Sequence, residues 1–166
     1  YLAVPNRFRG QVDSVIDGDT LQVRDSIGNR VTVRLWGLDA PEQAQPFGPA
    51  ATRIARELAA GESVVVEARD TGPYGRVIGR VQTDDLDVGR SLVLSGVAWH
   101  QRNYATSERL VELEKEARRR GNGLWEQDEP VPPWHFREGR GASAQKVADA
   151  KGVIGWLIFG IILLAS

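Results

Sequence analysis

Cysteine is missing from all 166 residues of this chain. Its absence excludes disulfide bonds, a thiol nucleophile and a zinc site built on thiolates. It leaves the cellular compartment open, because a protein without cysteine suits both oxidising and reducing surroundings. Methionine is absent as well, even from position 1, so we expect a processed or trimmed chain.

The chain also lacks an excess of positive charge. It carries 21 Lys and Arg residues against 22 Asp and Glu residues, for a formal net charge of −1. Any surface that binds nucleic acid must therefore be a local one. Lysine is scarce, with 3 residues against 18 arginines. Arginine suits planar contacts with phosphate, although a compositional bias explains the same excess.

A full-length transmembrane run is lacking too. The longest uncharged apolar stretch, Val153–Ala165, has 13 residues, whereas a helix that crosses a bilayer needs ~20. Because the sequence stops inside this run, we expect residues 153–166 to be a truncated transmembrane segment. A Pro/Gly/Arg-rich linker is expected over residues 128–152. The alternative is a C-terminal helix that docks in a groove or in an oligomer.

What the chain does contain is a strong β-hairpin pattern. Apolar and polar residues alternate over Thr20–Asp25 and again over Arg30–Gly37, with a turn-rich segment between them. A period of two beside a Gly/Asn turn is typical of a hairpin. If the turn is centred just before Gly28, Asp19 lies opposite about Trp36.

Four carboxylates flank this hairpin at its open end. Asp17 and Asp19 precede the first strand, and Asp39 and Glu42 follow the second. A hairpin brings its two ends together, so these side chains should meet, with Arg34 on the strand face that looks away from the core. Asp-Gly-Asp also occurs in ordinary turns, but the spacing of the whole set favours a functional site.

Such a cluster suits phosphodiester chemistry. Carboxylate oxygens are ligands of hard cations such as Ca²⁺ or Mg²⁺. The planar fork of arginine matches two phosphate oxygens. A cation and an arginine together neutralise the charge that builds on phosphorus oxygens in the transition state. A carboxylate that does not ligate the metal is then free to orient or deprotonate water.

Three motifs in this order resemble the staphylococcal (thermonuclease-like) nuclease family, over about residues 10–126. They are Asp17-Gly18-Asp19-Thr20, Arg34-Leu35-Trp36-Gly37-Leu38-Asp39-Ala40-Pro41-Glu42 and Tyr74-Gly75-Arg76. The resemblance implies an α+β, mainly β, fold: a five-stranded OB-fold barrel with about three packed helices. This domain would occupy residues 10–127, after a lead-in at residues 1–9 and before the C-terminal apolar tail.

Local patterns predict the remaining elements. Further strands are expected at Arg9–Ile16, Ser63–Asp70, Arg76–Thr83 and, more briefly, Val97–Arg102. Helices are expected between Gly48 and Gly61, over Asp87–Ser95 and over Ser107–Arg120.

The resemblance also implies an activity, namely calcium-dependent endonucleolytic cleavage of DNA and/or RNA, with single strands preferred and 3′-phosphate products. The implied Ca²⁺ ligands are Asp19, Asp39 and the backbone carbonyl of Ala40. Asp17 would support the shell around the metal. These assignments rest on the family and not on composition or spacing.

Three residues carry the implied catalysis. Ca²⁺ and Arg34 would neutralise the scissile phosphate, Glu42 would activate or orient the attacking water, and Arg76 would stabilise the pentacoordinate phosphorus. Two tyrosines are implied in substrate binding. Tyr74 would offer its hydroxyl to a terminal phosphate, and Tyr104 is our choice for the residue that stacks on the substrate.

Two other classes of function remain open. An OB-like barrel can bind single-stranded nucleic acid or a protein without cleaving anything. The apolar tail can equally make the domain a membrane-tethered adaptor. We expect a monomer that is anchored to a membrane. Calcium chemistry and secretory processing favour the extracytoplasmic side, whereas basic residues ahead of the tail favour the cytoplasmic face: Arg137, Arg140, Lys146 and Lys151.

Overall fold

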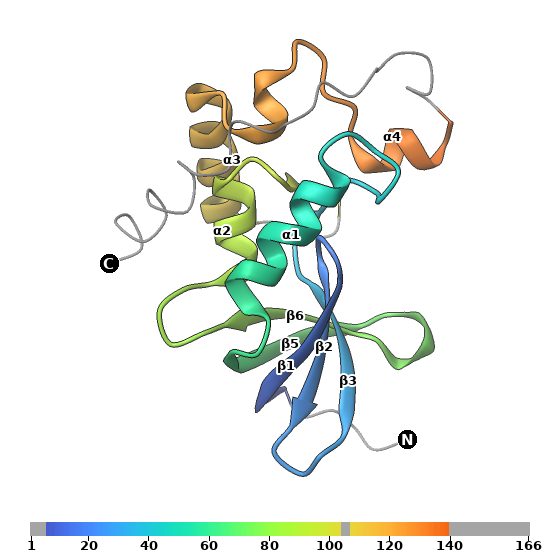
Figure 1. Cartoon of the computed structure of the whole chain (residues 1–166), viewed down its shortest axis with the longest axis vertical. Coiled ribbons are helices and arrows are strands. Elements are labelled where there is room, and N and C mark those ends of the chain that lie inside the picture. Colours follow the sequence, from blue (N-terminus) through green and yellow to red (C-terminus); the bar gives the residue numbers. More distant parts are fainter. Residues whose placement is uncertain (1–5, 104–106, 140–166) are drawn as a thin grey trace.

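The computed structural model describes residues 6–103 and 107–139. Five strands form a closed barrel in the order β1-β2-β3-β6-β5, and β4 pairs with β7 in a separate two-stranded sheet. In Figure 1 the helices gather over one end of this barrel. The strands are β1 Arg7–Asp17, β2 Thr20–Asp25, β3 Arg30–Leu35, β4 Leu38–Asp39, β5 Ser63–Thr71, β6 Val77–Gln82 and β7 Trp99–His100. The helices are α1 Gly48–Ala59, α2 Val88–Leu94, α3 Glu108–Arg120 and α4 Pro133–Arg137, with short 3₁₀ turns at Pro73–Gly75 and Gly123–Glu126.

The predicted fold class is confirmed. The chain forms a mainly β barrel of five strands with helices packed on it. The described residues hold four α-helices where about three were expected. The addition is α4, which forms inside residues 128–152, where we expected a linker. Proline at its first turn suits a helix start, because the missing N–H is not needed there.

The hairpin of β2 and β3 forms as predicted, with its register shifted by one residue. Asp19 lies opposite Leu35, whose N–H donates to the Asp19 carbonyl at 2.8 Å, and not opposite Trp36. The shift arises in the turn. The Asp25 carboxylate accepts the N–H groups of Ile27 and Asn29 at 3.0 and 2.8 Å, which centres the turn on Ile27.

The barrel closes where β3 runs parallel to β6. Arg34 lies opposite Ile78, and Leu35 lies opposite Gly79. A Cβ on Gly79 would come within 2.7 Å of the Glu67 carbonyl on β5, so only glycine allows the strands to approach this closely. This register places Arg76, the residue just before β6, level with the middle of β3.

One hydrophobic core links the barrel to its helices. Fully buried barrel residues come from every strand of the closed sheet and include Val12, Leu21, Val23, Val33, Val66, Val77 and Val81.

Two of the helices are capped by side chains at their N-termini. Asp87 caps helix α2, and its carboxylate accepts the Arg90 N–H at 2.9 Å. Ser107 caps helix α3, and its hydroxyl accepts the Leu110 N–H at 3.3 Å. Both are standard N-terminal caps.

Several predictions fall on residues that are not described. The tail at residues 153–166 and the proposed stacking residue Tyr104 lie outside the described ranges. Within residues 6–103 and 107–139, no helix is both long enough and apolar enough to cross a membrane.

We expect Gly79→Ala to lower the free energy of unfolding by roughly 1–3 kcal/mol, because the added methyl group would press on the backbone of β5. Urea denaturation of the two proteins measures the difference. Gly72→Ala is the matched control, since its Cβ would meet nothing closer than 3.4 Å and its φ of −84° suits any residue. Equal losses in both variants would contradict this account of barrel closure.

Candidate active site

The centre of the site is an arginine held between two buried aspartates. The Arg34 guanidinium donates to Asp19 Oδ1 at 2.5 Å and to Asp39 Oδ1 at 2.6 Å. Asp19 and Asp39 are only 3% and 2% exposed. Arg34 comes from β3, Asp19 from the turn before β2, and Asp39 from β4, so the open end of the hairpin brings the three side chains together.

The Asp19 carboxylate is deeply embedded in this cluster. It accepts the Ala40 N–H at 2.8 Å and the Thr20 hydroxyl at 3.0 Å. Burial raises the pKa of Asp19 to about 7, although the neighbouring Arg34 acts in the opposite direction. Asp17 also raises this pKa, and its own carboxylate accepts the Asp19 N–H at 3.0 Å. The Arg34 guanidinium therefore does not fully offset the effects of burial and of the neighbouring carboxylates on Asp19.

Arg34 itself stays charged. Burial acts to lower its pKa, but Asp19 and Asp39 outweigh burial and the pKa is raised above the ordinary value. An arginine in this state acts as a permanent positive charge at the bottom of the site.

A groove of about 430 Å³ opens beside Arg34 and Asp39. Arg76 lines it from the start of β6, and Pro73 and Gln101 lie along the same groove. The Arg76 Nε is buried and has no hydrogen-bond partner among the described residues. A buried guanidinium donor without a partner, beside a second arginine, suits an anionic ligand such as a phosphate.

Glu42 lies in the loop that follows β4 and is contacted by an arginine that the sequence analysis placed elsewhere. Arg137 on α4 donates from Nη1 to Glu42 Oε1 at 2.6 Å and from Nη2 to Asp39 Oδ2 at 2.7 Å. These hydrogen bonds, first to Asp39 and then to Glu42, raise the pKa of Arg137. The sequence places Arg137 among the basic residues of the expected linker before the apolar tail. In the structure its side chain lies at the site.

Helix α4 is fixed to the domain at two points. The Gln45 side chain donates to the Val131 carbonyl at 2.5 Å. The Trp134 ring meets the Trp99 ring edge-on, with the ring centroids 5.8 Å apart. The only sequence signal for this helix was the pair of prolines before Trp134. Its docking position depends on contacts with residues distant in the sequence, such as Gln45, which lies 86 positions before Val131, and no local pattern encodes them.

Of the two proposed substrate-binding tyrosines, Tyr104 lies outside the described residues, and Tyr74 forms no hydrogen bond with the described residues of this cluster. Tyr74 is fully exposed and has a φ of 62°, in the left-handed region. It sits in the turn next to Pro73, which lines the groove. Trp99, from the predicted strand Val97–Arg102, is a packing residue. Its ring is 7% exposed and lies 4.4 Å from the Trp125 ring.

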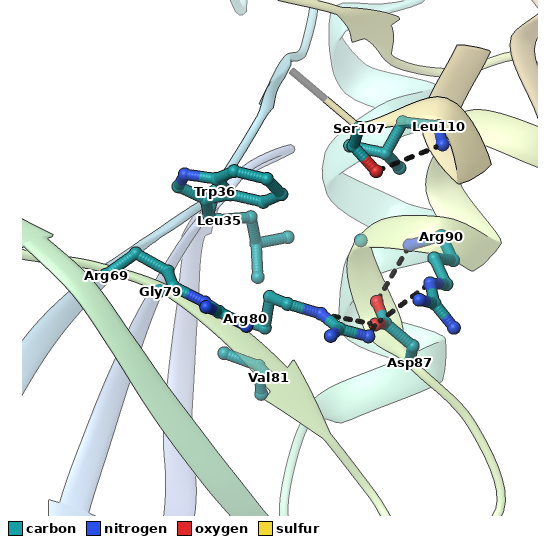
Figure 2. A pocket seen from close by; sticks show the side chains of 11 residues that line it. Leu35, Trp36, Arg69, Gly79, Arg80, Val81, Asp87, Arg90, Ser107 and Leu110 are labelled. Atoms are coloured by element: carbon teal, nitrogen blue, oxygen red, sulfur yellow. Dashed lines mark hydrogen bonds and ion pairs between the residues drawn. The ribbon is translucent and has the colours of Figure 1, made fainter. Parts of the chain in front are cut away.

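A second pocket lies between the barrel and helices α2 and α3 (Figure 2). Trp36 and several arginines line it. Arg80 donates to Asp87 at 2.8 and 3.2 Å, and Asp87 also caps α2. The charges here are paired across the junction between β6 and α2, so we interpret this pocket as part of the packing between elements.

The donors of the first site fit a hard cation. Asp19, Asp39 and the Ala40 carbonyl present only oxygen atoms, which is the ligand type that Ca²⁺ prefers. The raised pKa of Asp19 indicates that further positive charge would stabilise its ionised form. Within the described residues, no three acidic, histidine or cysteine side chains gather as a metal cluster. Water or substrate oxygens would have to complete the coordination.

Comparison with known proteins agrees with this geometry. A family model described as "Staphylococcal nuclease homologue" matches residues 32–127. An "Uncharacterized endonuclease" of Escherichia coli is 40% identical over 131 residues, which cover 78% of this chain and 85% of that protein. A "Micrococcal nuclease" of Shigella flexneri is 37% identical over 143 residues, covering 78% and 80%. A "Probable staphylococcal-like nuclease" of Oryza sativa subsp. japonica is 33% identical over 128 residues, covering 74% and 39%. The chain belongs to the family of staphylococcal nuclease homologues.

Proposed function

We propose that this protein is a calcium-dependent endonuclease that hydrolyses phosphodiester bonds of DNA and/or RNA and leaves 3′-phosphate ends. The observation that carries the proposal is the Arg34 guanidinium held between Asp19 and Asp39 beside a groove that Arg76 also lines. Its relatives named as nucleases support the assignment. Single strands are the proposed substrate because their phosphates can enter a groove of this size without a second strand.

The acidic residues of the site divide into two roles. Asp19, Asp39 and the Ala40 carbonyl would hold the calcium ion, and Asp17 keeps Asp19 in place through the hydrogen bond to its N–H. When bound, Ca²⁺ supplies positive charge next to the phosphate that is attacked. Glu42 is more exposed than either aspartate and remains available to take a proton from water.

The reaction can then be written for the residues of this chain. Glu42 accepts a proton as the water oxygen bonds to phosphorus, and the bond from phosphorus to the 5′ oxygen breaks. The leaving oxygen takes up a proton from solvent. Arg34 and Arg76 donate hydrogen bonds to the phosphate oxygens, which carry more negative charge in the transition state than in the substrate. Tyr74 and Tyr104 remain proposed contacts to the rest of the substrate.

We also propose where the protein is located and that it is a monomer. Attachment to a membrane through residues 153–166, a monomeric state and an extracytoplasmic position are proposals that rest on the sequence alone. None of them is needed for the chemistry described above.

Glu42→Gln should lower the turnover of labelled single-stranded DNA by about 10²–10³-fold, because the amide accepts no proton from water. Cleavage is compared with Ca²⁺ and with a chelator, and it should need the cation. Glu57→Gln, which changes an exposed glutamate of α1, is the control and should cut normally. Undiminished cutting by Glu42→Gln would contradict its role. Tight binding of DNA without any cutting by the unmodified protein would instead make it a binding module.

Arg34 and Arg76, two of the three arginines that line the groove, should separate stability from catalysis. Arg34→Gln leaves the buried Asp19 without its cation and Asp39 with Arg137 alone, and it should lower the free energy of unfolding by about 3 kcal/mol. Arg76→Gln removes a guanidinium whose Nε has no partner among the described residues, so stability should change little. Its cleavage rate should nevertheless fall on the order of 10²–10³-fold. Urea denaturation and cleavage assays on both variants measure this, and equal losses of stability would argue against the assignment.

A further inference from the structure

Arg137 connects the two carboxylates to which different roles were given above. Its guanidinium uses one terminal nitrogen for Glu42 and the other for Asp39, at 2.6 and 2.7 Å. Nη1 also lies 3.4 Å from Asp39 Oδ1. A rigid planar fork that contacts two carboxylates at once fixes their relative position, which a single point charge does not do.

The Glu42 side chain has little else to hold it. It is 41% exposed and lies in a loop, and among the described residues its carboxylate forms an ion pair only with Arg137. A glutamate in this situation samples several rotamers. A general base must instead stay within hydrogen-bond reach of the water that it deprotonates. Arg137 supplies the restraint that the loop itself lacks.

One residue ties the Glu42 loop to the segment that carries Arg137. The buried Gln45 side chain accepts the Glu42 N–H at 3.1 Å through Oε1. Through Nε2 it donates to the Val131 carbonyl at 2.5 Å, just before α4. The Glu42 backbone and the start of α4 are therefore held by the same amide group, and the Trp134–Trp99 contact fixes the helix further.

We propose that Arg137 is a positioning residue for hydrolysis, which acts by holding the Glu42 carboxylate beside Asp39. This inference rests on the proposed nuclease function and adds a residue from beyond the matched stretch 32–127. Arg137 also lines the groove, and each of its terminal nitrogens carries a second N–H, so phosphate binding is the competing role that the measurement of KM tests. Positioning also gives a reason for the half-exposed Arg137, near the C-terminal end of the described residues, to contact both carboxylates.

The decisive experiment is a double-mutant cycle in the whole chain with Ca²⁺ and single-stranded DNA. Arg137→Gln should lower kcat on the order of 10–100-fold, the usual loss when a residue that orients a catalytic ligand is removed. KM should change little, because the substrate is not contacted. In the Glu42→Gln background the same change should cost nothing further, since the group that Arg137 positions is already inactive. Arg137→Lys should recover only part of the activity, because an ammonium cannot bridge both carboxylates.

Three further measurements separate positioning from a structural or binding role. The midpoint temperature of thermal unfolding should be nearly unchanged in Arg137→Gln. If it falls, the kinetic comparison with the unmodified protein is made with Arg137→Lys instead. Fluorescence anisotropy in chelator should give an unchanged Kd for the oligonucleotide, and calorimetric titration should show no loss of Ca²⁺ affinity. The matched control is Arg119→Gln, which removes a guanidinium that also contacts a carboxylate at two points, Glu116 on the exposed face of α3. That variant should behave like the unmodified protein.

Several outcomes would overturn the inference. Losses that multiply in the double variant would mean that Arg137 acts independently of Glu42. A raised KM with unchanged kcat would make it a phosphate-binding residue. A gain in both kcat and Ca²⁺ affinity would mean that the guanidinium competes with the cation. If the unmodified protein cuts and Glu42→Gln does not, while Arg137→Gln cuts normally, only this inference fails. If the unmodified protein does not cut, the proposed function fails with it.

Discussion

The site and the barrel depend on one interaction, the Arg34 guanidinium between Asp19 and Asp39. Removing two carboxylates from water costs several kcal/mol each unless a cation and hydrogen bonds compensate. Arg34 can do this because β3 carries it to the open end of the hairpin, where β2 and β4 bring the aspartates. The register of the hairpin is therefore a structural requirement and a functional one at the same time, since a slip of one residue would turn Arg34 to the other face.

Arg34 does not fully offset the cost of burying the Asp19 carboxylate. Asp19 keeps a raised pKa although Arg34 touches it, first because the carboxyl is buried and then because Asp17 and Asp39 lie nearby. Arg137 adds a second guanidinium on the outer side, and Arg76 lies in the same groove. A further positive charge beside Asp19 would favour its ionised form. The surrounding core of valines and leucines supplies the stability that such a site does not.

Much of this arrangement could be predicted from the sequence, and the exceptions have physical causes. Alternation over residues 20–25 and 30–37 predicted the hairpin, because a buried strand face repeats every second residue. The register was wrong by one residue because Asp25 centres the turn on Ile27 through hydrogen bonds of both its side chain and its backbone, which the turn composition did not specify. Arg137 was misplaced because its partners lie 95 and 98 residues away. Nothing near it in the sequence distinguishes it from a solvent-exposed charge.

The site draws on residues from both ends of the described chain. The matched family stretch begins at residue 32 and ends at residue 127, so it contains Arg34, Asp39, Glu42 and Arg76 but neither Asp19 nor Arg137. Asp19 is placed by the barrel itself, because its backbone carbonyl accepts the Leu35 N–H at the end of the hairpin. Arg137 lies at the site because α4 and the segment just before it pack on Gln45 and Trp99. A five-residue helix has little stability of its own. Its place is set by the surface that the barrel and β7 have already built. The barrel itself therefore brings together Asp19, Asp39 and Arg34, whereas the orientation of Glu42 depends on a contact from the C-terminal segment.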